Sequence, residues 1–269
     1  MGRNSRIDWT DNTWNPIIGC YKKCPYCYAE RIANRFAGHI DLMDDTWSQT
    51  KCNGYEIYDV KTLQLRNTNG KVTAGPYPFG FKPTFLRYKL DEPQQWKSPK
   101  IIFVGSMTDM FAEWIPDSWI LKVFEACRKA PQHVYMFLTK NPSRYIHLIE
   151  HGLLPDDEIK NNMWFGTTFT TNDDPYFFID EKSLGHPFNG FLSIEPLHSD
   201  FNENLLLREH SIKWVIIGAE TGNRVGKIVP KREWIENIVN SCDKCGVPVF
   251  MKTNIWDVIP DAIRTDFPF

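Results

Sequence analysis

The sequence predicts an α/β protein, a partial or complete (β/α) barrel with an insertion after the first helix. From Ile101 onward, short apolar runs alternate with longer stretches of helical character, which is the pattern of repeated βα units over a parallel sheet. The length of 269 residues and the 42% hydrophobic content suit one barrel domain. Residues 38–82 break this alternation. We therefore expect a single domain over residues 1–269, with an inserted lid or cap at about 38–82.

Near-continuous apolar runs mark the strands, and they are expected to be buried on both faces of the sheet. The runs lie at 101–104, 134–138, 163–167, 190–194, 214–217 and 247–251. Two weaker candidates are 14–18, which would deliver a cysteine-rich loop, and 83–88, where Pro83 limits a strand to beginning at that residue. Together they approach the strand number of a complete TIM barrel.

Helical periodicity and turn residues define the other elements. Helices are predicted at 28–36, 117–130, 142–151 and 231–245. The first directly follows the cysteines, so the order is strand, cysteine loop, helix. Inside the insertion, residues 67–71 carry a hairpin-turn signal and residues 75–80 a loop signal, which favours an ordered lid.

Composition limits the protein class. The net charge of −2 and the pI of about 6.4 give no global attraction to nucleic acid, so such a partner must meet a local patch. Seven cysteines, three of them clustered, are typical of a reducing compartment. No apolar run of about 18 residues occurs, and the first residues lack an apolar signal region. We expect a cytoplasmic protein without a membrane partner.

Cys20, Cys24 and Cys27 form a C-x3-C-x2-C loop. A structural zinc site and an ordinary ferredoxin-type cluster each take one more protein ligand than this loop offers. The trio therefore indicates an iron–sulfur cube with one iron left open for chemistry. A zinc site completed by a histidine or a remote cysteine stays open as an alternative, whereas a thioredoxin-like C-x-x-C would leave Cys20 unexplained.

This loop resembles that of the radical S-adenosylmethionine (SAM) superfamily. Tyr26 adds to the resemblance, because the residue before the third cysteine is usually aromatic there and lies near the adenine of SAM. The resemblance implies a [4Fe-4S] cluster on Cys20, Cys24 and Cys27 that cleaves SAM reductively, giving a radical that abstracts a hydrogen atom from a substrate. It also implies a barrel of the radical SAM type and a reducing partner such as flavodoxin or ferredoxin.

Polar residues at the carboxyl ends of the predicted strands are the remaining site candidates, because the reactive face of a βα barrel lies there. Candidates for binding SAM are Ser106, Asp109, Thr139 and Thr167. Candidate catalytic residues are Glu195, Glu220, Lys140 and Lys252. All are expected to converge on one cavity. The alternatives are that each glutamate pairs with Lys140 or Lys252 as an ion pair lining the barrel, and that the hydroxyls bond loop backbone.

The chain also resembles a phage-associated family of three-cysteine, radical-SAM-like proteins of unassigned function. The matching segments are IDWTDNTWNP at 7–16, SMTD at 106–109, LTK at 138–140, SIEPL at 193–197, GAETG at 218–222 and VPVF at 247–250, with Lys252. This association suggests a nucleotide or nucleic-acid base as substrate, for modification or repair. A basic cluster beside the cysteines would meet phosphates, although a solvated helix face explains it equally: Lys22, Lys23, Arg31 and Arg35.

Two other functions are left open. One is a non-catalytic, zinc-stabilised module that binds nucleic acid or protein. The other is a βα-barrel hydrolase with Glu195 and Glu220 as paired carboxylates. Asp8, Asp11 and Asn15 either position the cysteine loop by hydrogen bonds or are ordinary turn residues, and the second interpretation is favoured. The sequence assigns no role to the remaining cysteines, and the second C-x-x-C falls at a predicted helix end, remote from the strand ends: Cys52, Cys127, Cys242 and Cys245.

Overall fold

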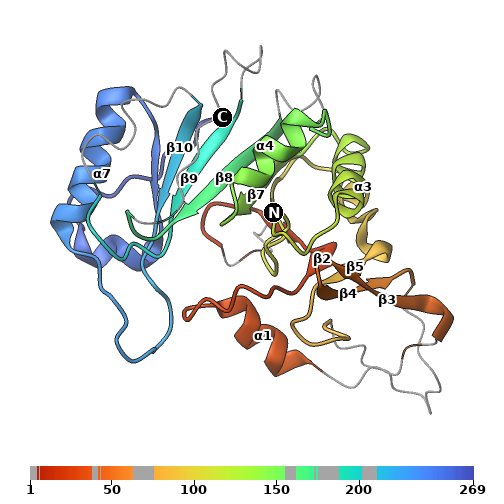
Figure 1. Ribbon diagram of the computed structural model, residues 1–269. Helices are drawn as coiled ribbons and strands as arrows, with labels where there is room; N and C mark the ends of the chain where they lie inside the picture. Colours follow the sequence, from red (N-terminus) through yellow and green to blue (C-terminus); the bar gives the residue numbers. More distant parts are fainter. Residues whose placement is uncertain are drawn as a thin grey trace. The chain divides into compact units, whose positions relative to one another are not determined.

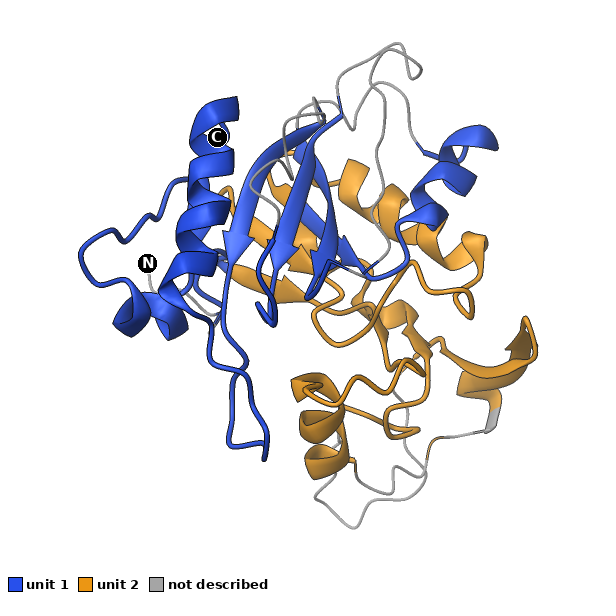
Figure 2. Cartoon of the chain, turned by 60° about the vertical axis from the view of Figure 1, so that its left-hand side comes forward, with its two compact units in different colours: residues 1–11, 136–269 blue, residues 12–135 orange. Residues whose placement is uncertain are grey.

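The computed structural model describes residues 5, 7–37, 42, 44–62, 76–154, 162–172, 174, 188–201 and 211–269. Within it the chain divides into two compact units (Figure 2). Unit 1 comprises residues 1–11 and 136–269, and unit 2 comprises residues 12–135. No helix in the described part of the chain is long and apolar enough to cross a membrane. The expected single domain and its lid stay predictions.

A seven-stranded sheet is formed by the described residues, in the order β1-β6-β7-β8-β9-β10-β11 (Figure 1). Its strands are β1 Asn12–Trp14, β6 Ile101–Val104, β7 Val134–Thr139, β8 Met163–Phe169, β9 Gly190–Ile194, β10 Ile212–Ile217 and β11 Val249–Met251. The pairs β1/β6, β8/β9, β9/β10 and β10/β11 are parallel. The α/β class and all six apolar runs predicted as strands are confirmed. The strand order is linear, as in a partial barrel.

Unit 1 packs its helices on these buried strands. They are α4 Ser143–Glu150, α7 Arg232–Cys245 and the 3-10 helix η3 Thr253–Val258. Ile235, Ile238 and Cys242 of α7 join one buried cluster with residues of β9, β10 and β11. Every residue of β9 is buried, as expected for a strand covered on both faces. Gly246, with φ of 66°, ends α7 in the left-handed conformation that favours glycine.

Unit 2 holds a second, four-stranded sheet in the order β2-β5-β4-β3. Its strands are β2 Ile17–Ile18, β5 Thr84–Leu86, β4 Tyr55–Val60 and β3 Trp47–Cys52. The helical elements of this unit are α1 Tyr28–Phe36, α2 Glu92–Gln95, α3 Asp117–Arg128, and the 3-10 turns η1 Asp44–Thr46 and η2 Arg87–Lys89. The helix predicted directly after the cysteines is therefore confirmed with the same bounds.

Two strand predictions near the cysteines are only partly right. The predicted strand 14–18 is divided between β1 in the large sheet and β2 in the small one. Pro16 lies between them, and a proline cannot donate a ladder hydrogen bond, so one continuous strand is disfavoured. The predicted barrel strand 83–88 is β5, which pairs with β2 and β4 and ends at Leu86 before a 3-10 turn.

The insertion contributes an antiparallel hairpin of β3 and β4. Its turn is Asn53-Gly54, with φ of 48° and 84°. Two successive positive φ angles are the signature of a type I′ turn, for which Asn-Gly is the preferred pair. The turn expected at 67–71 lies outside the described residues. Within the described residues, the insertion thus contains a hairpin built around an Asn-Gly pair that the sequence analysis does not single out.

Candidate functional site

Gly19 fixes the start of the cysteine loop in unit 2. Its φ is +85°, and a Cβ at this position would clash with the carbonyl group of Lys82. Its N–H donates to the carbonyl oxygen of Met107 at 2.9 Å, and Thr108 Oγ1 donates to its carbonyl oxygen at 2.7 Å. Only glycine satisfies both the positive φ and the close approach. The loop is therefore held against the segment that follows β6.

Backbone N–H groups of the same loop point at two of the three sulfurs. The N–H of Lys22 donates to Cys20 Sγ at 3.4 Å, and the N–H of Glu30 donates to Cys27 Sγ at 3.3 Å. Cys27 is thereby the N-cap of α1. Lys23 adopts a positive φ of 50°, which turns the chain between the first two cysteines. Backbone donors of this kind tune sulfur ligands of iron–sulfur clusters.

The three cysteines are reduced, half-buried and close enough to interact electrostatically. The pKa of the Cys20 thiol is raised to about 12, chiefly by burial and to a smaller extent by the charges of Asp109, Cys24 and Cys27, while the hydrogen bond from Lys22 opposes the rise. Within the described ranges, no group of three or more His, Cys, Asp or Glu residues has an arrangement that could hold a metal ion. What these residues offer a cluster is therefore their donor chemistry. Three sulfurs lie on one loop, and backbone N–H groups donate to two of them.

Ser106 and Asp109 lie in the segment that holds the cysteine loop. Ser106 Oγ donates to Asn15 Oδ1 at 3.2 Å, and the hydroxyl of Tyr28 donates to the carbonyl oxygen of Ser106 at 2.7 Å. Asp109 is buried, and its Oδ1 accepts from the N–H of Phe111 at 3.2 Å. Asn15 also accepts from the N–H of Met107 at 3.0 Å. Asn15 is therefore a positioning residue, and its interpretation as an ordinary turn residue was wrong.

The insertion hairpin is anchored to the cysteine loop by aromatic rings. Tyr21 stacks on Tyr55 with ring centroids 5.4 Å apart and meets the edge of Trp114 at 5.6 Å. Its hydroxyl donates to the carbonyl oxygen of Glu56 at 2.7 Å. Aromatic pairs of this geometry add to the stabilisation from burial. Tyr21, which the sequence reading did not single out, therefore joins the insertion to the residue next to Cys20.

Replacement of Gly19 by alanine is expected to disrupt this loop. The Gly19→Ala change combines positive-φ strain with a clash against the Lys82 carbonyl, so we expect a loss of at least about 3 kcal/mol in unfolding free energy. Gly54→Ala is the matched control, because its φ is +84° and nothing lies within 4 Å of a Cβ there. Chemical denaturation should show a loss of only about 1 kcal/mol for the control. Equal losses of unfolding free energy in the two variants would show that the loop relieves the clash at residue 19 without a further loss of stability.

In unit 1, Glu195 and Lys252 form an ion pair at the ends of β9 and β11. Gly218, which follows β10, leaves room for it: a Cβ there would lie 3.0 Å from Lys252 Cδ and 3.1 Å from Glu195 Cδ. Both side chains are largely buried. The pair therefore matches the alternative that the sequence left open, and it places a fixed carboxylate and ammonium group at the ends of β9 and β11, the two strands that flank β10.

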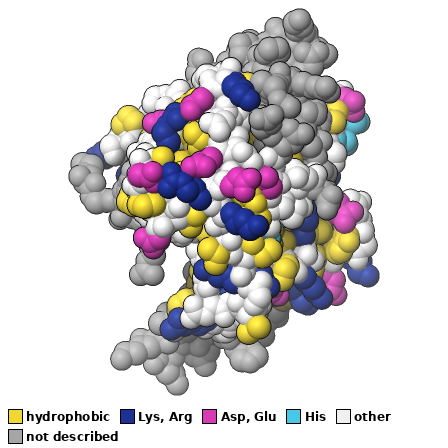
Figure 3. Space-filling view, turned by 90° about the vertical axis from the view of Figure 1, so that its left-hand side faces the viewer, with side chains coloured by type: hydrophobic (Ala, Val, Ile, Leu, Met, Phe, Trp, Pro, Cys, Tyr) yellow, Lys and Arg dark blue, Asp and Glu magenta, His cyan; other side chains and the backbone are white. Residues whose placement is uncertain are grey.

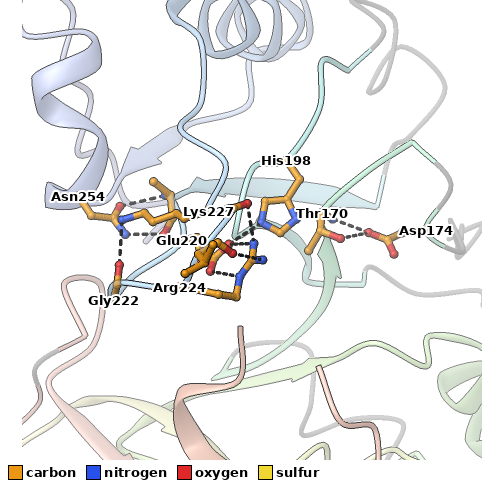
Figure 4. A network of polar contacts seen from close by, with 11 residues as sticks. Thr170, Asp174, His198, Glu220, Gly222, Arg224, Lys227 and Asn254 are labelled. Atoms are coloured by element: carbon orange, nitrogen blue, oxygen red, sulfur yellow. Dashed lines mark hydrogen bonds and ion pairs between the residues drawn. The ribbon is translucent and has the colours of Figure 1, made fainter. Parts of the chain in front are cut away.

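Glu220, which follows β10, is the centre of a second charged group (Figure 4). Its side chain is 1% exposed, and Arg224 donates to both carboxylate oxygens, from Nε at 2.7 Å and from Nη2 at 2.8 Å. His198 Nε2 lies 3.2 Å from Oε2. The hydrogen bonds from Arg224 hold the pKa of Glu220 below its usual value, against the opposing effect of burial. The sequence predicts lysines as the partners of Glu220, whereas the structure shows Arg224. Residues 220–224 are not helical, so their spacing of four residues gave no local signal for this pair.

The network continues to the end of β8. Asp174 Oδ2 accepts from the N–H of Thr170 at 2.5 Å, from its hydroxyl at 2.7 Å and from the N–H of Thr171 at 3.0 Å. The carbonyl oxygen of Thr170 accepts from the N–H of His198 at 3.0 Å. Burial raises the pKa of Asp174, but these hydrogen bonds and the charge of Lys140 outweigh it and leave the pKa below its usual value. The charge of Lys140 is thus one of the causes that lower the pKa of Asp174.

The two predicted threonines are buried in unit 1. Thr139 Oγ1 accepts from the N–H of Asn141 at 2.9 Å, which is the local backbone bond that the alternative interpretation names. Thr167 lies within β8, opposite Leu192 of β9. In unit 2, the structure therefore places Ser106 and Asp109 on the segment that holds the cysteine loop. Thr139 lies in unit 1, and its backbone partner, Asn141, lies in the same unit.

Asp8 has a structural contact that the sequence reading did not predict. Its Oδ2 accepts from the N–H of Thr253 at 2.8 Å and from the hydroxyl of the same residue at 2.9 Å. These are the bonds of an N-terminal cap, here on η3. Asp8 therefore ties the amino-terminal segment to the residues that follow Lys252.

At the end of α7, Cys242 is buried and Cys245 is exposed, and burial raises the pKa of Cys242 to about 12.

The contribution of Glu220 to stability should depend on pH. Above its usual pKa of 4.5 the carboxylate is charged in both the folded and the unfolded chain, so the stabilisation by Arg224 is complete. As the pH falls, the unfolded chain takes up the proton first, and the contribution disappears through the lower folded pKa. Relative to Glu220→Gln, we expect an advantage of about 2 kcal/mol at neutral pH that is lost as the pH falls through the lowered pKa of the folded chain. Urea unfolding across this range measures it, and a pH-independent difference would contradict it.

Comparison with known proteins identifies the family of the chain. No curated protein matches the sequence, and no solved structure matches the fold. A family model described as a protein of unknown function, DUF5131, matches residues 4–258 and so covers the cysteine loop, both charged groups and nearly all described elements. The chain therefore belongs to the DUF5131 family.

Proposed function

We propose that the protein is a radical SAM enzyme with a partial barrel of the radical SAM type. The observation that carries this proposal is the architecture of the cysteine loop. Its three sulfurs lie on one short segment, with backbone N–H groups donating to Cys20 and Cys27, and Gly19 fixes it to the segment that carries Ser106 and Asp109. An ordinary disulfide or a buried structural thiol needs none of these features.

When bound, a [4Fe-4S] cluster together with SAM supplies a carbon radical that can remove a hydrogen atom from an unactivated C–H bond. Cys20, Cys24 and Cys27 would hold the cluster. Tyr26 and Asp109 would orient SAM, because they lie on the loop and on the segment bound to it. A reducing partner such as flavodoxin or ferredoxin would deliver the electron.

The charged groups of unit 1 are suited to binding a polar substrate. The ion pair of Glu195 and Lys252 presents both charges from a partly buried position, with side-chain exposures of 24% and 15%. Lys140 and Thr167 are further candidates at the adjoining strands. Such fixed groups orient a substrate without reorganising when it binds. A nucleotide, either free or as the unit that carries a nucleic-acid base, fits this description because it offers phosphate, hydroxyl and amide groups together.

The test is product formation from SAM alone. Anaerobically purified protein, reduced with dithionite and incubated with SAM, should release 5'-deoxyadenosine, measured by liquid chromatography. Omission of the reductant is the control, because electron transfer must precede cleavage. Absence of product from protein whose iron content indicates a full cluster would overturn the proposal.

A further inference from the structure

The connection between β10 and α7, residues 221–231, exposes aliphatic side chains in an unusual concentration. Val225 is 96% exposed, Val229 66% and Ile228 36%. Val225 is the most exposed large hydrophobic side chain in the described part of the chain. In Figure 1 this connection, called the β10–α7 loop below, extends away from the strands of its own unit. Three solvated aliphatic groups so close together mark an interaction surface.

The loop is held in shape by Arg224. While its guanidinium binds Glu220, Nη1 donates to the carbonyl oxygen of Val225 at 3.2 Å and Nη2 to that of Gly226 at 3.3 Å. Lys227 Nζ donates to the carbonyl oxygen of Gly222 at 3.4 Å. Glu220 is nearly inaccessible, so the loop is anchored in the protein interior. Val225 is therefore presented by a preorganised turn, which lowers the entropy cost of binding a partner.

The charged side chains of the β10–α7 loop are all positive. Residues 221–231 include Arg224, Lys227 and Lys231 and contain no Asp or Glu. Arg224 is neutralised by Glu220, while Lys227 and Lys231 are exposed. Figure 3 shows hydrophobic, basic and acidic side chains intermixed on the face drawn. Lysines flanking an aliphatic tip complement a partner that has closely spaced phosphates around an apolar interior.

We propose that the β10–α7 loop inserts into double-stranded nucleic acid, with Val225 and Val229 as a wedge between base steps and Lys227 and Lys231 on the backbone phosphates. Aliphatic wedges of this kind separate stacked base pairs, and separation exposes a base for chemistry. The inference rests on the proposed function in one respect, because it names the substrate class as duplex nucleic acid. The loop begins directly after Glu220, so a duplex engaged there meets the carboxyl ends of the strands in unit 1.

Other partners fit the composition less well. Proteins that bind single strands stack bases on aromatic rings, and residues 221–231 contain none. Segments that bind lipid surfaces bury a broad apolar helix face rich in Trp, Phe and Leu, whereas this loop offers three small aliphatic groups on an irregular turn. Of these three partners, a nucleic-acid duplex is the one that a small aliphatic tip with flanking lysines fits best.

The experiment measures duplex binding with the intact, anaerobically purified protein. Fluorescence anisotropy of a labelled duplex of about two helical turns is recorded at several salt concentrations, together with its single strand. We expect tighter binding of the duplex. The double variant Val225→Ser/Val229→Ser should weaken it about tenfold. Lys227→Gln should reduce the slope of log K against log salt by about one. Ile263→Ser, at a residue 39% exposed, and Lys97→Gln, at an exposed lysine of unit 2, are matched controls expected to bind as the wild type does.

Two results would overturn the inference. One is unchanged duplex affinity in the Val225→Ser/Val229→Ser variant. The other is tighter binding to vesicles containing phosphatidylserine than to the duplex, with loss of that binding in the same variant, which would identify a lipid surface as the partner. Release of 5'-deoxyadenosine is measured in parallel. A variant that loses duplex binding but cleaves SAM normally supports the inference, while duplex binding without SAM cleavage in the wild type would refute the proposed function alone.

Discussion

A Cys24→Ala variant should lose its iron and release no 5'-deoxyadenosine above background. Cys24 is the middle ligand of the proposed trio, and its carbonyl oxygen also closes the turn that carries the N–H of Cys27, at 3.0 Å. Loss of an outer hydrogen bond to a metal ligand typically costs about 10–100-fold in affinity or activity. Loss of a ligand should exceed this, so we expect product to fall by more than about a hundredfold.

Cys52→Ala is the matched control for that variant. Cys52 is also reduced and half-buried. It lies in the insertion hairpin, and its sulfur is 3.8 Å from the carbonyl oxygen of Glu113, which follows β6. Iron content and product formation should therefore stay at the wild-type level. Undiminished product from Cys24→Ala would remove Cys24 from the ligand set. Equal losses in both variants would show that the assay reports general thiol damage.

An Arg224→Met variant should be strongly destabilised. Arg224 supplies two hydrogen bonds to the carboxylate of Glu220, whose side chain is 1% exposed, and His198 is a further partner at 3.2 Å. Removing one partner of a buried charge typically costs about 3–5 kcal/mol, and the partial exposure of Arg224 and the remaining contact with His198 place the expected loss near the lower limit. The free energy of unfolding at neutral pH, from urea titration, measures the effect.

The double variant Arg224→Met/Glu220→Met separates charge from packing. If the cost of the single variant comes from the isolated carboxylate, removing the carboxylate as well should restore much of the lost stability. The single variant should also recover relative to wild type as the pH falls, because protonation neutralises Glu220. A double variant less stable than the single one would show instead that the arginine acts mainly by packing on the loop.

Much of the fold was predictable from local patterns. The run Ile101–Val104 and the helix Tyr28–Phe36 have the predicted bounds. Each is a continuous apolar or amphipathic stretch between clear start and stop signals, so local periodicity was sufficient. The strand expected at 14–18 failed, because Pro16 redirects the chain into a second sheet and an apolar run does not specify its partner.

The candidate site was only partly predictable. The cysteine spacing and the residues Ser106 and Asp109 come from local motifs that carry their own chemical meaning. Long-range contacts have no such signal: Asp8 caps Thr253 from 245 residues away. The Asn53-Gly54 turn was a local signal that was overlooked in favour of residues 67–71. Partner choice among charged residues depends on the three-dimensional fold, as the pairing of Glu220 with Arg224 shows.

The central claim is that Cys20, Cys24 and Cys27 hold an iron–sulfur cluster with one iron open to SAM. The most direct measurement is elemental and sulfide analysis of anaerobically purified protein, combined with electron paramagnetic resonance of the reduced sample with and without SAM. We predict about four iron and four sulfide per chain, and a spectrum that changes when SAM is added. Colourless protein with about one zinc per chain and no iron would contradict the account and indicate a zinc-stabilised binding module.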